Sequence, residues 1–220
     1  MPRLLFEKKG NAVWISHLDL MRLFQRAFKR AGLPLTHTQG YNPRPSVSIA
    51  LPLSVGIDSS CEILDFDLDG ENAANGEIRE RLNQALVDGV RVLEVYNEGQ
   101  KIKFLALLDC VVSLEYDDGA SDETVSAIQG LFGREEVLVE KKTKSGEIQN
   151  QNIISMIRRI MVSRKGQNTV ELRALICCQN PTLNPMQMVA AIEKYLPDRK
   201  PDFAKCSRLE IYDNNETIFR

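Results

Sequence analysis

The chain has 220 residues, of which 43% are hydrophobic and 26% charged, values that exclude a disordered tail, a collagen-like fibre and a coiled coil. The longest apolar runs, such as residues 104–108, are far below the ~18 residues of a membrane-spanning helix, and we see no signal or transit peptide. Five cysteines are too few for a disulfide framework and favour a reducing cytoplasm. We therefore expect a cytoplasmic globular protein with one large or two small domains, away from any membrane.

The formal net charge of -2 is unevenly distributed along the chain. Residues 1–57 carry a net charge of +6, residues 58–140 carry -14 and residues 141–220 carry +6. Segments of one sign bear on binding partners rather than on the fold. The basic first segment could meet phosphate or an acidic protein, or it could lie against the acidic middle of its own chain.

The first helix has clear boundaries in the sequence. Ser16 is a favourable N-cap, and Asp19 stands at the third helical position, where a carboxylate can answer free backbone N–H groups. Apolar residues then recur at three- and four-residue spacing as far as Ala31, which gives the helix one apolar face. Gly32 suits a left-handed C-terminal cap, and Pro34 prevents continuation of the helix.

The other segments of the first half alternate between strand and helix patterns. The sequence predicts strands at residues 3–7, 12–15, 47–55, 64–69 and 90–96, a loop at 36–46 and a helix at 78–86 that Gly89 closes. The strand at 64–69 has an acidic outer face, and Pro52 indicates an edge or a bulge near the end of the strand at 47–55. The order β-α-β-β-α-β is that of the ferredoxin-like fold.

The second half repeats this order approximately. The sequence predicts strands at residues 112–116, 137–140, 170–176 and 208–212, and helices at 125–132 and, after Asn184 and Pro185, at 188–196. Residues 141–152 are expected to be loop. Residues 153–162 fit helix or strand, although a turn at 166–168 favours a hairpin. We therefore predict an α+β fold of two tandem ferredoxin-like halves with antiparallel sheets, at residues 1–104 and 105–220, the second with an inserted hairpin.

Motifs that define common enzymes are absent from the sequence. It has no P-loop, no Gly-x-Gly-x-x-Gly, no Gly-x-Ser-x-Gly, no His-Glu-x-x-His and no Cys-x-x-Cys. The neighbours Cys177 and Cys178 would point to opposite faces of a strand, so we expect them to pack rather than chelate. Only two histidines, His17 and His37, are available for a metal site. We therefore expect no cofactor and no metal in this chain, and we lean against its being an enzyme.

Polar residues that could form a site are concentrated around the start of the first helix and the loop after it. Arginines recur every fourth residue along the helix and would form one cationic ridge opposite its apolar face. A stiff, polar, aromatic-bearing loop follows at residues 39–45. The candidate binding residues are Ser16, His17, Asp19, Arg22, Arg26, Arg30, Gln39, Tyr41, Asn42 and Arg44.

Each of these residues also has a purely structural interpretation. Asp19 can serve as a capping carboxylate or as a partner of Arg22, and His17 can be a hydrogen-bonded structural residue. The arginine ridge can be an ordinary solvated face, and Tyr41 is as suited to packing as to stacking. As catalytic residues, His17 and Asp19 are weak candidates for a general acid–base and its orienting carboxylate.

Two stretches of this segment closely resemble a known family. Residues 15–22, Ile-Ser-His-Leu-Asp-Leu-Met-Arg, and residues 39–43, Gln-Gly-Tyr-Asn-Pro, are similar to the radical SAM-linked protein family, domain of unknown function 2344. The resemblance is strong over residues 3–68. It departs at Tyr41, Arg44 and Ser46, where the family usually has Phe, His and Lys. The resemblance implies that a partner radical SAM protein supplies the iron–sulfur cluster and SAM, and it names no reaction.

Three functions from different classes fit the sequence. The first is an accessory module that holds a substrate, RNA by our expectation, for a radical SAM enzyme. The second is a protein–protein adaptor that docks through the acidic strand at 62–69 and the helix at 76–88. The third is a metal-independent RNA-processing enzyme that uses His17, Asp19 and an arginine. We rank them in this order because the cationic ridge and the absent cofactor motifs favour the first.

Overall fold

The computed structural model describes residues 2–70, 73–142 and 146–220. The chain divides into two compact units, unit 1 (Met1–Ile102 with Arg220) and unit 2 (Lys103–Phe219), whereas the sequence placed the division before residue 105. The described residues contain four α-helices together with β-strands, so the fold is mixed α/β. The strand pairs described below are antiparallel.

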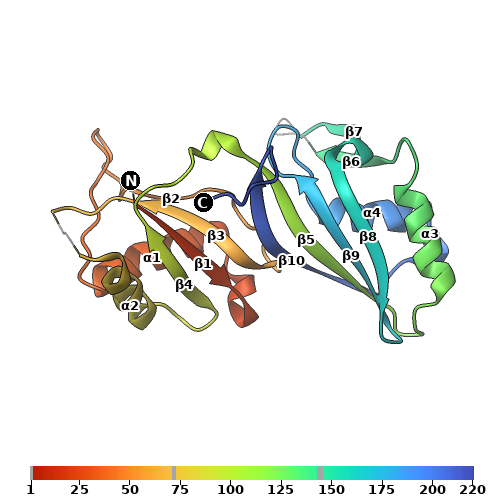
Figure 1. The fold of residues 1–220 in the computed structure, drawn as a ribbon, viewed down its shortest axis with the longest axis horizontal. Coiled ribbons are helices and arrows are strands. Elements are labelled where there is room, and N and C mark those ends of the chain that lie inside the picture. Colours follow the sequence, from red (N-terminus) through yellow and green to blue (C-terminus); the bar gives the residue numbers. More distant parts are fainter. Residues whose placement is uncertain (1, 71–72, 143–145) are drawn as a thin grey trace. The chain divides into compact units, whose positions relative to one another are not determined.

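Unit 1 contains one sheet with the strand order β4-β1-β3-β2 (Figure 1). Its elements in chain order are β1 (Arg3–Lys8), the 3₁₀ helix η1 (Gly10–Trp14), α1 (His17–Arg30), β2 (Val47–Ile49), β3 (Asp58–Phe66), α2 (Asn75–Ala85) and β4 (Val90–Tyr96). The prediction of a strand at 90–96 is confirmed.

The core of unit 1 lies between the two helices and one face of this sheet. Alternate residues of the strands are buried together with the apolar face of α1 and with Ile78 and Leu82 of α2. Phe24 meets Phe6 edge-on with the ring centroids 4.8 Å apart, and the centroids of Phe28 and Phe66 are 5.1 Å apart. This packing fixes α1 so that its opposite, polar face is turned to solvent.

Three predictions for unit 1 are wrong. The strand expected at 64–69 begins earlier and ends earlier, because β3 runs from Asp58 to Phe66 along β1. Residues 12–15 do not form a strand, because i→i+3 hydrogen bonds from Ala12 to Lys9 and from Ile15 to Ala12 wind the segment into η1. The strand at 47–55 is only the three residues of β2. Ala50 still donates its backbone N–H to Ile63, but Pro52 has no N–H to continue the ladder.

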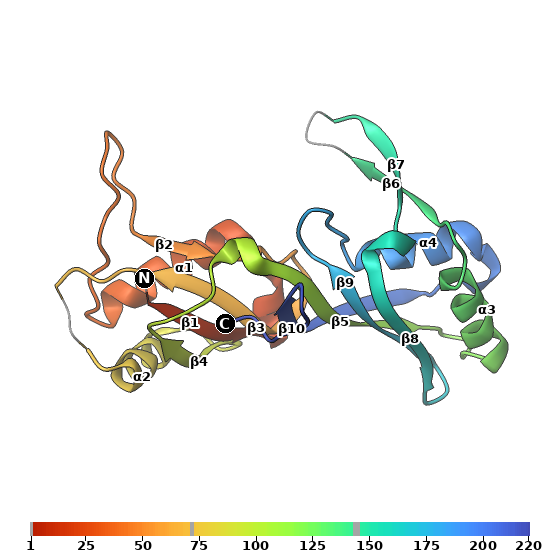
Figure 2. The ribbon, with the colours of Figure 1, turned by 45° about the horizontal axis from the view of Figure 1, so that its top comes forward.

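Unit 2 has the order β-α-β-β-β-β-α-β, and four of its strands form a sheet with the order β10-β5-β9-β8. Its elements are β5 (Leu105–Glu115), α3 (Asp122–Phe132), β6 (Leu138–Lys142), β7 (Ile148–Asn152), β8 (Ile157–Lys165), β9 (Thr169–Cys177), α4 (Met186–Tyr195) and β10 (Phe203–Asp213). The short 3₁₀ helices are η2 (Ile102–Phe104), η3 (Ile154–Met156) and η4 (Pro197–Arg199). The strands β6 and β7 pair with each other alone and form a separate hairpin between α3 and β8 (Figure 2).

Four assignments in unit 2 differ from the sequence-based expectation. The strand expected at 112–116 begins at Leu105, because β5 pairs along its length with β9 and β10. Residues 148–152 form β7 instead of loop, and residues 143–145 of that expected loop lie outside the described residues. The ambiguous stretch 153–162 is resolved as η3 and most of β8, which pairs with β9. The last strand, β10, starts five residues earlier than predicted, at Phe203. Its amphipathic alternation is interrupted because a bulge lies between Arg208 and Glu210.

All five cysteines are free and buried. Burial raises the pKa of Cys178 to about 12, so its thiol stays protonated at neutral pH. Cys177 and Cys178 are both buried, in agreement with a packing role. No α-helix in the described ranges is long and apolar enough to cross a membrane.

Candidate functional site

The start of α1 is a capped helix terminus built by Ser16 and Asp19. The Ser16 Oγ accepts a hydrogen bond from the Asp19 backbone N–H at 3.2 Å and donates to Asp19 Oδ2 at 2.7 Å. Arg22 Nη1 donates to Asp19 Oδ1 at 3.0 Å. The hydrogen bond from Ser16, followed by that from Arg22, lowers the pKa of Asp19. Asp19 is therefore a capping carboxylate and an ion-pair partner at once, and it is ionised at neutral pH.

His17 is half-buried as the first residue of α1. Its Nδ1 atom is buried and forms no hydrogen bond with any of the described residues. The hydrogen bonds of the Asp19 carboxylate go to Ser16 and Arg22, so Asp19 does not orient the imidazole. No group of three or more His, Cys, Asp or Glu side chains among the described residues is placed to hold a metal ion.

The three arginines of α1 share one exposed face but have different partners. Successive residues four apart are offset by about 40° around a helix and about 6 Å along it, so Arg22, Arg26 and Arg30 form a continuous row. Arg22 pairs with Asp19, and Arg30 Nη2 donates to the backbone oxygen of Ala85 at 2.5 Å. Arg26 is exposed and makes no hydrogen bond or ion pair with the described residues.

These arginines line a shallow hollow between α1 and the segment that follows α2. Its volume is about 450 Å³, and its apolar lining comes from Ile15, Leu23 and Val87. The structure therefore brings the predicted ridge and Asp19 together at one surface. We call this surface, formed by Arg22, Arg26 and Arg30, the arginine face.

The loop between α1 and β2 projects from unit 1 as a narrow arm (Figure 2). Its two sides are joined by backbone pairing of His37 with Pro45 and by a 2.8 Å hydrogen bond from Thr38 N–H to the Arg44 oxygen. The Thr38 Oγ1 also accepts from the Arg44 N–H at 3.0 Å. Tyr41 at the tip is 100% exposed, which excludes the packing role for its ring.

The tip and the base of this loop have different relations to α1. Gln39, Asn42 and Arg44 are exposed, and no hydrogen bond or ion pair within the described ranges joins them to the arginine face. At the base, His37 and Pro45 line a second hollow of about 430 Å³ together with Gln25 and Lys29 of α1. Neither Lys29 nor His37 is among the binding residues predicted from the sequence, although a cation next to Arg30 can be read directly from the sequence.

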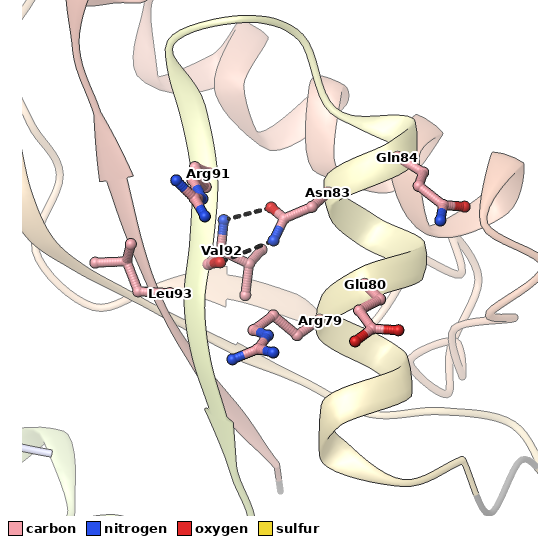
Figure 3. A pocket seen from close by; sticks show the side chains of 7 residues that line it. All are labelled: Arg79, Glu80, Asn83, Gln84, Arg91, Val92 and Leu93. Atoms are coloured by element: carbon pink, nitrogen blue, oxygen red, sulfur yellow. Dashed lines mark hydrogen bonds between the residues drawn. The ribbon is translucent and has the colours of Figure 1, made fainter.

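A third hollow lies between α2 and β4, where Arg79 and Arg91 flank Asn83 (Figure 3). The Asn83 side chain accepts from the Val92 N–H at 2.8 Å and donates to the Val92 oxygen at 2.9 Å, so it occupies the free edge of β4 at that residue. Such pairing blunts an edge strand. The two arginines are twelve positions apart in an acidic stretch, and Glu80 also lines the hollow, so no sequence pattern indicates that they meet.

The acidic strand expected as a docking face is largely engaged within unit 1. Asp65 forms an ion pair with Arg3, whose Nε lies 2.5 Å from Asp65 Oδ1. Asp67 lies beyond the end of β3 and accepts from Thr36 Oγ1 at 3.0 Å. The prediction of an open acidic face along residues 64–69 is therefore wrong for these two carboxylates, because they are used to hold β1 and the loop.

The fold and these surfaces define an α/β protein with an exposed cationic helix. The chain belongs to the family described as an uncharacterized protein conserved in bacteria (DUF2344), whose model matches residues 2–185. No curated protein matches the chain significantly.

Solved structures show a likeness of fold at low sequence identity. A chain of the Cbf5-Nop10-Gar1 complex is 10% identical with a TM-score of 0.51, and the match covers 96% of the present chain and 48% of that chain. A chain of the archaeal box H/ACA sRNP Nop10-Cbf5 complex is 8% identical with a TM-score of 0.49, covering 94% and 46%. The present chain thus spans about half the length of these chains.

Proposed function

We propose that this protein is an accessory module that holds RNA for a radical SAM enzyme. The observation that carries the proposal is the arginine face, in which Arg26 is exposed and, within the described residues, makes no hydrogen bond or salt bridge, although its charge helps to lower the pKa of Asp19. Cations on an exposed helix contact phosphate without reading the base, which suits a module that holds a substrate while another protein acts on it. Tyr41 at the tip of the loop is available to stack on a base.

The partner is inferred from the motif resemblance. Residues 15–22 and 39–43 are similar to proteins fused to, or encoded beside, radical SAM proteins, and both stretches lie in unit 1. The iron–sulfur cluster and SAM would then belong to the partner. Placing the iron–sulfur cluster in the partner is consistent with a sequence that carries no Cys-x-x-Cys.

We also infer that each unit is a ferredoxin-like fold. The inference is supported by the strand orders β4-β1-β3-β2 and β10-β5-β9-β8, which are equivalent when the strands of each unit are numbered in chain order, with β6 and β7 left aside as an insertion. Sheets of this type bind single-stranded RNA in other proteins, but the fold alone also hosts many other functions. The arginine face, and not the fold, therefore carries the proposal.

A fluorescence anisotropy titration tests RNA binding. The purified chain is titrated with labelled bulk tRNA and rRNA fragments at about 50 and 200 mM salt. We expect salt-sensitive binding that the double variant Arg22→Glu/Arg26→Glu loses. The matched control is Arg79→Glu/Arg91→Glu, which reverses the same amount of charge in the hollow of Figure 3.

The outcomes separate the proposed function from its alternatives. Equal loss in both double variants would mean that net charge, not the arginine face, governs binding. If no RNA pool binds but the radical SAM partner is captured from nuclease-treated extract, the chain is an adaptor. Cleavage or conversion of a small-RNA pool by the chain alone would indicate an RNA-processing enzyme.

A further inference from the structure

The hollow beside the loop base has an apolar floor and a polar rim. It lies between the second half of α1 and residues 32–37, and Pro34, Leu35 and Pro45 contribute apolar surface. The backbone that forms it is fixed by hydrogen bonds. The Leu33 N–H donates to the Phe28 oxygen at 2.9 Å around Gly32, which has a φ of 66°, and His37 pairs with Pro45. The hollow is therefore preformed.

The rim carries groups with no partner among the described residues. Lys29 is exposed and makes no hydrogen bond or ion pair there, and the same is true of the exposed His37 side chain. Lys29 is three residues after Arg26, so the two cations are neighbours on the surface of α1. The hollow and the arginine face share no lining residue, but Lys29 places a cation at the rim of the hollow next to Arg26.

We propose that this hollow receives one unstacked nucleobase of the RNA that the arginine face holds. The proposal rests on the proposed function and names the form of substrate, a single strand with a splayed base. A flat, apolar group would fit against Pro34, Leu35 and Pro45. An anionic backbone attached to that group would lie beside the cations Lys29 and Arg26. Single-stranded RNA combines both properties, and histidine rings such as that of His37 stack on bases.

The two histidines make a direct binding test simple. The C2 protons of His17 and His37 are followed by NMR in the full chain while uridine or adenosine 5′-monophosphate is added. The His37→Gln variant assigns the two signals. We expect the nucleotides to shift the His37 signal and to leave that of His17 unchanged. Ribose 5-phosphate and inorganic phosphate at equal concentration should shift the His37 signal much less, because they offer no base to stack on the ring.

An absent shift at His37 with every nucleotide would overturn the proposal. An equal shift with ribose 5-phosphate or phosphate would also overturn it, because the hollow would then recognise only an anion.

A second measurement uses a variant that fills the hollow without changing charge. Gln25 is a half-buried residue of α1 at its wall, and Gln25→Phe places a ring there. We expect this variant to bind single-stranded oligoribonucleotides about tenfold more weakly, with the salt dependence retained. Gln84→Phe on the exposed side of α2 is the matched control.

The two variants distinguish the failure of this inference from the failure of the proposed function. If Arg22→Glu/Arg26→Glu abolishes RNA binding while Gln25→Phe matches its control, the hollow takes no base and the arginine face still holds RNA. If the wild-type chain binds no RNA, both proposals are overturned.

Discussion

Arg30 and Arg81 each hold the C-terminal end of the other's helix. Arg30 of α1 donates to the oxygen of Ala85, the last residue of α2. Arg81 of α2 donates from Nε to the Ala31 oxygen at 2.9 Å and from Nη2 to the Gly32 oxygen at 2.8 Å, beyond the end of α1. Cations at helix C-termini satisfy free carbonyls and complement the helix dipole. One arginine of the arginine face is thus also structural.

These hydrogen bonds predict that substitutions of Arg30, Arg81 and Arg26 change the free energy of unfolding by different amounts. Arg30→Met should lower the free energy of unfolding by about 1 kcal/mol. Arg81→Met should lower it by about 2 kcal/mol, because it loses two hydrogen bonds to carbonyls and an exposed ion pair with Glu77. Arg26→Met should leave stability within about 0.5 kcal/mol of the wild type. Urea denaturation measures all three. A loss for Arg26→Met as large as that for Arg81→Met would contradict the description of Arg26 as an exposed side chain without a hydrogen bond to the described residues.

Arg26, whose substitution should have the smallest effect on stability, should have a clear effect on RNA affinity. Arg26→Met should weaken binding to every RNA about equally and reduce the slope of log K against log salt by about 1, as expected for one lost phosphate contact. Anisotropy titrations over a range of salt concentrations give this slope. An unchanged slope together with an unchanged affinity would remove Arg26 from the interface.

Tyr41 tests the projecting loop separately from the helix. Because its side chain is 100% exposed, Tyr41→Ala should not alter unfolding, but it should reduce affinity for single-stranded RNA by about 1–3 kcal/mol. Tyr41→Phe is the control, since it keeps the aromatic face and should bind as the wild type does. Equal affinity for the Ala and Phe variants would mean that the ring stacks on nothing.

The N-terminal cap of α1 predicts a pH dependence in acid. The pKa of Asp19 is lowered in the folded chain, so its stabilising effect is present above the unfolded value of 3.8 and is lost as the pH falls through the folded pKa. Asp19→Asn should remove this part of the acid dependence. Ser16→Ala should cost about 1 kcal/mol at neutral pH. Urea denaturation at several pH values measures both effects. If stability falls with acid in the same way in Asp19→Asn and in the wild type, the prediction for Asp19 is wrong.

Tyr96 and Tyr116 predict a loss of stability in alkali. Burial raises the pKa of each to about 12, above the ordinary value near 10. Between these two values the unfolded chain loses phenolic protons that the folded chain keeps, so stability falls as the pH rises from about 10 to about 12. Tyr96→Phe and Tyr116→Phe should each flatten this limb in denaturation measured against pH. Unchanged limbs in both variants would contradict the burial effect.

The sequence was informative where local rules decide the structure. The three- and four-residue spacing of α1, its Ser16 cap and Gly32 predicted a helix that matches the observed one within a residue. Local sequence patterns did not predict the limits of strands, because pairing with a neighbouring strand determines where a strand begins and ends. Alternation continues past Pro52 although the ladder ends at Ile49, and the polar segment 148–152 becomes a strand because β6 pairs with it.

The same distinction holds for the candidate site. The arginine spacing predicted a shared face, since residues four apart are neighbours on any helix. The sequence could not reveal that Arg30 donates to Ala85, fifty-five residues away, or that His37 and Lys29 line the same hollow. These contacts depend on how α2 and the loop pack on α1.

The most direct test of the central claim is to map where RNA touches the protein. The wild-type chain is irradiated with 4-thiouridine-labelled RNA fragments, digested and analysed by mass spectrometry for cross-linked peptides. The account predicts cross-links within residues 22–45, on α1 and its loop, that are lost in Arg22→Glu/Arg26→Glu. Cross-links confined to unit 2 or to the α2–β4 hollow would contradict it.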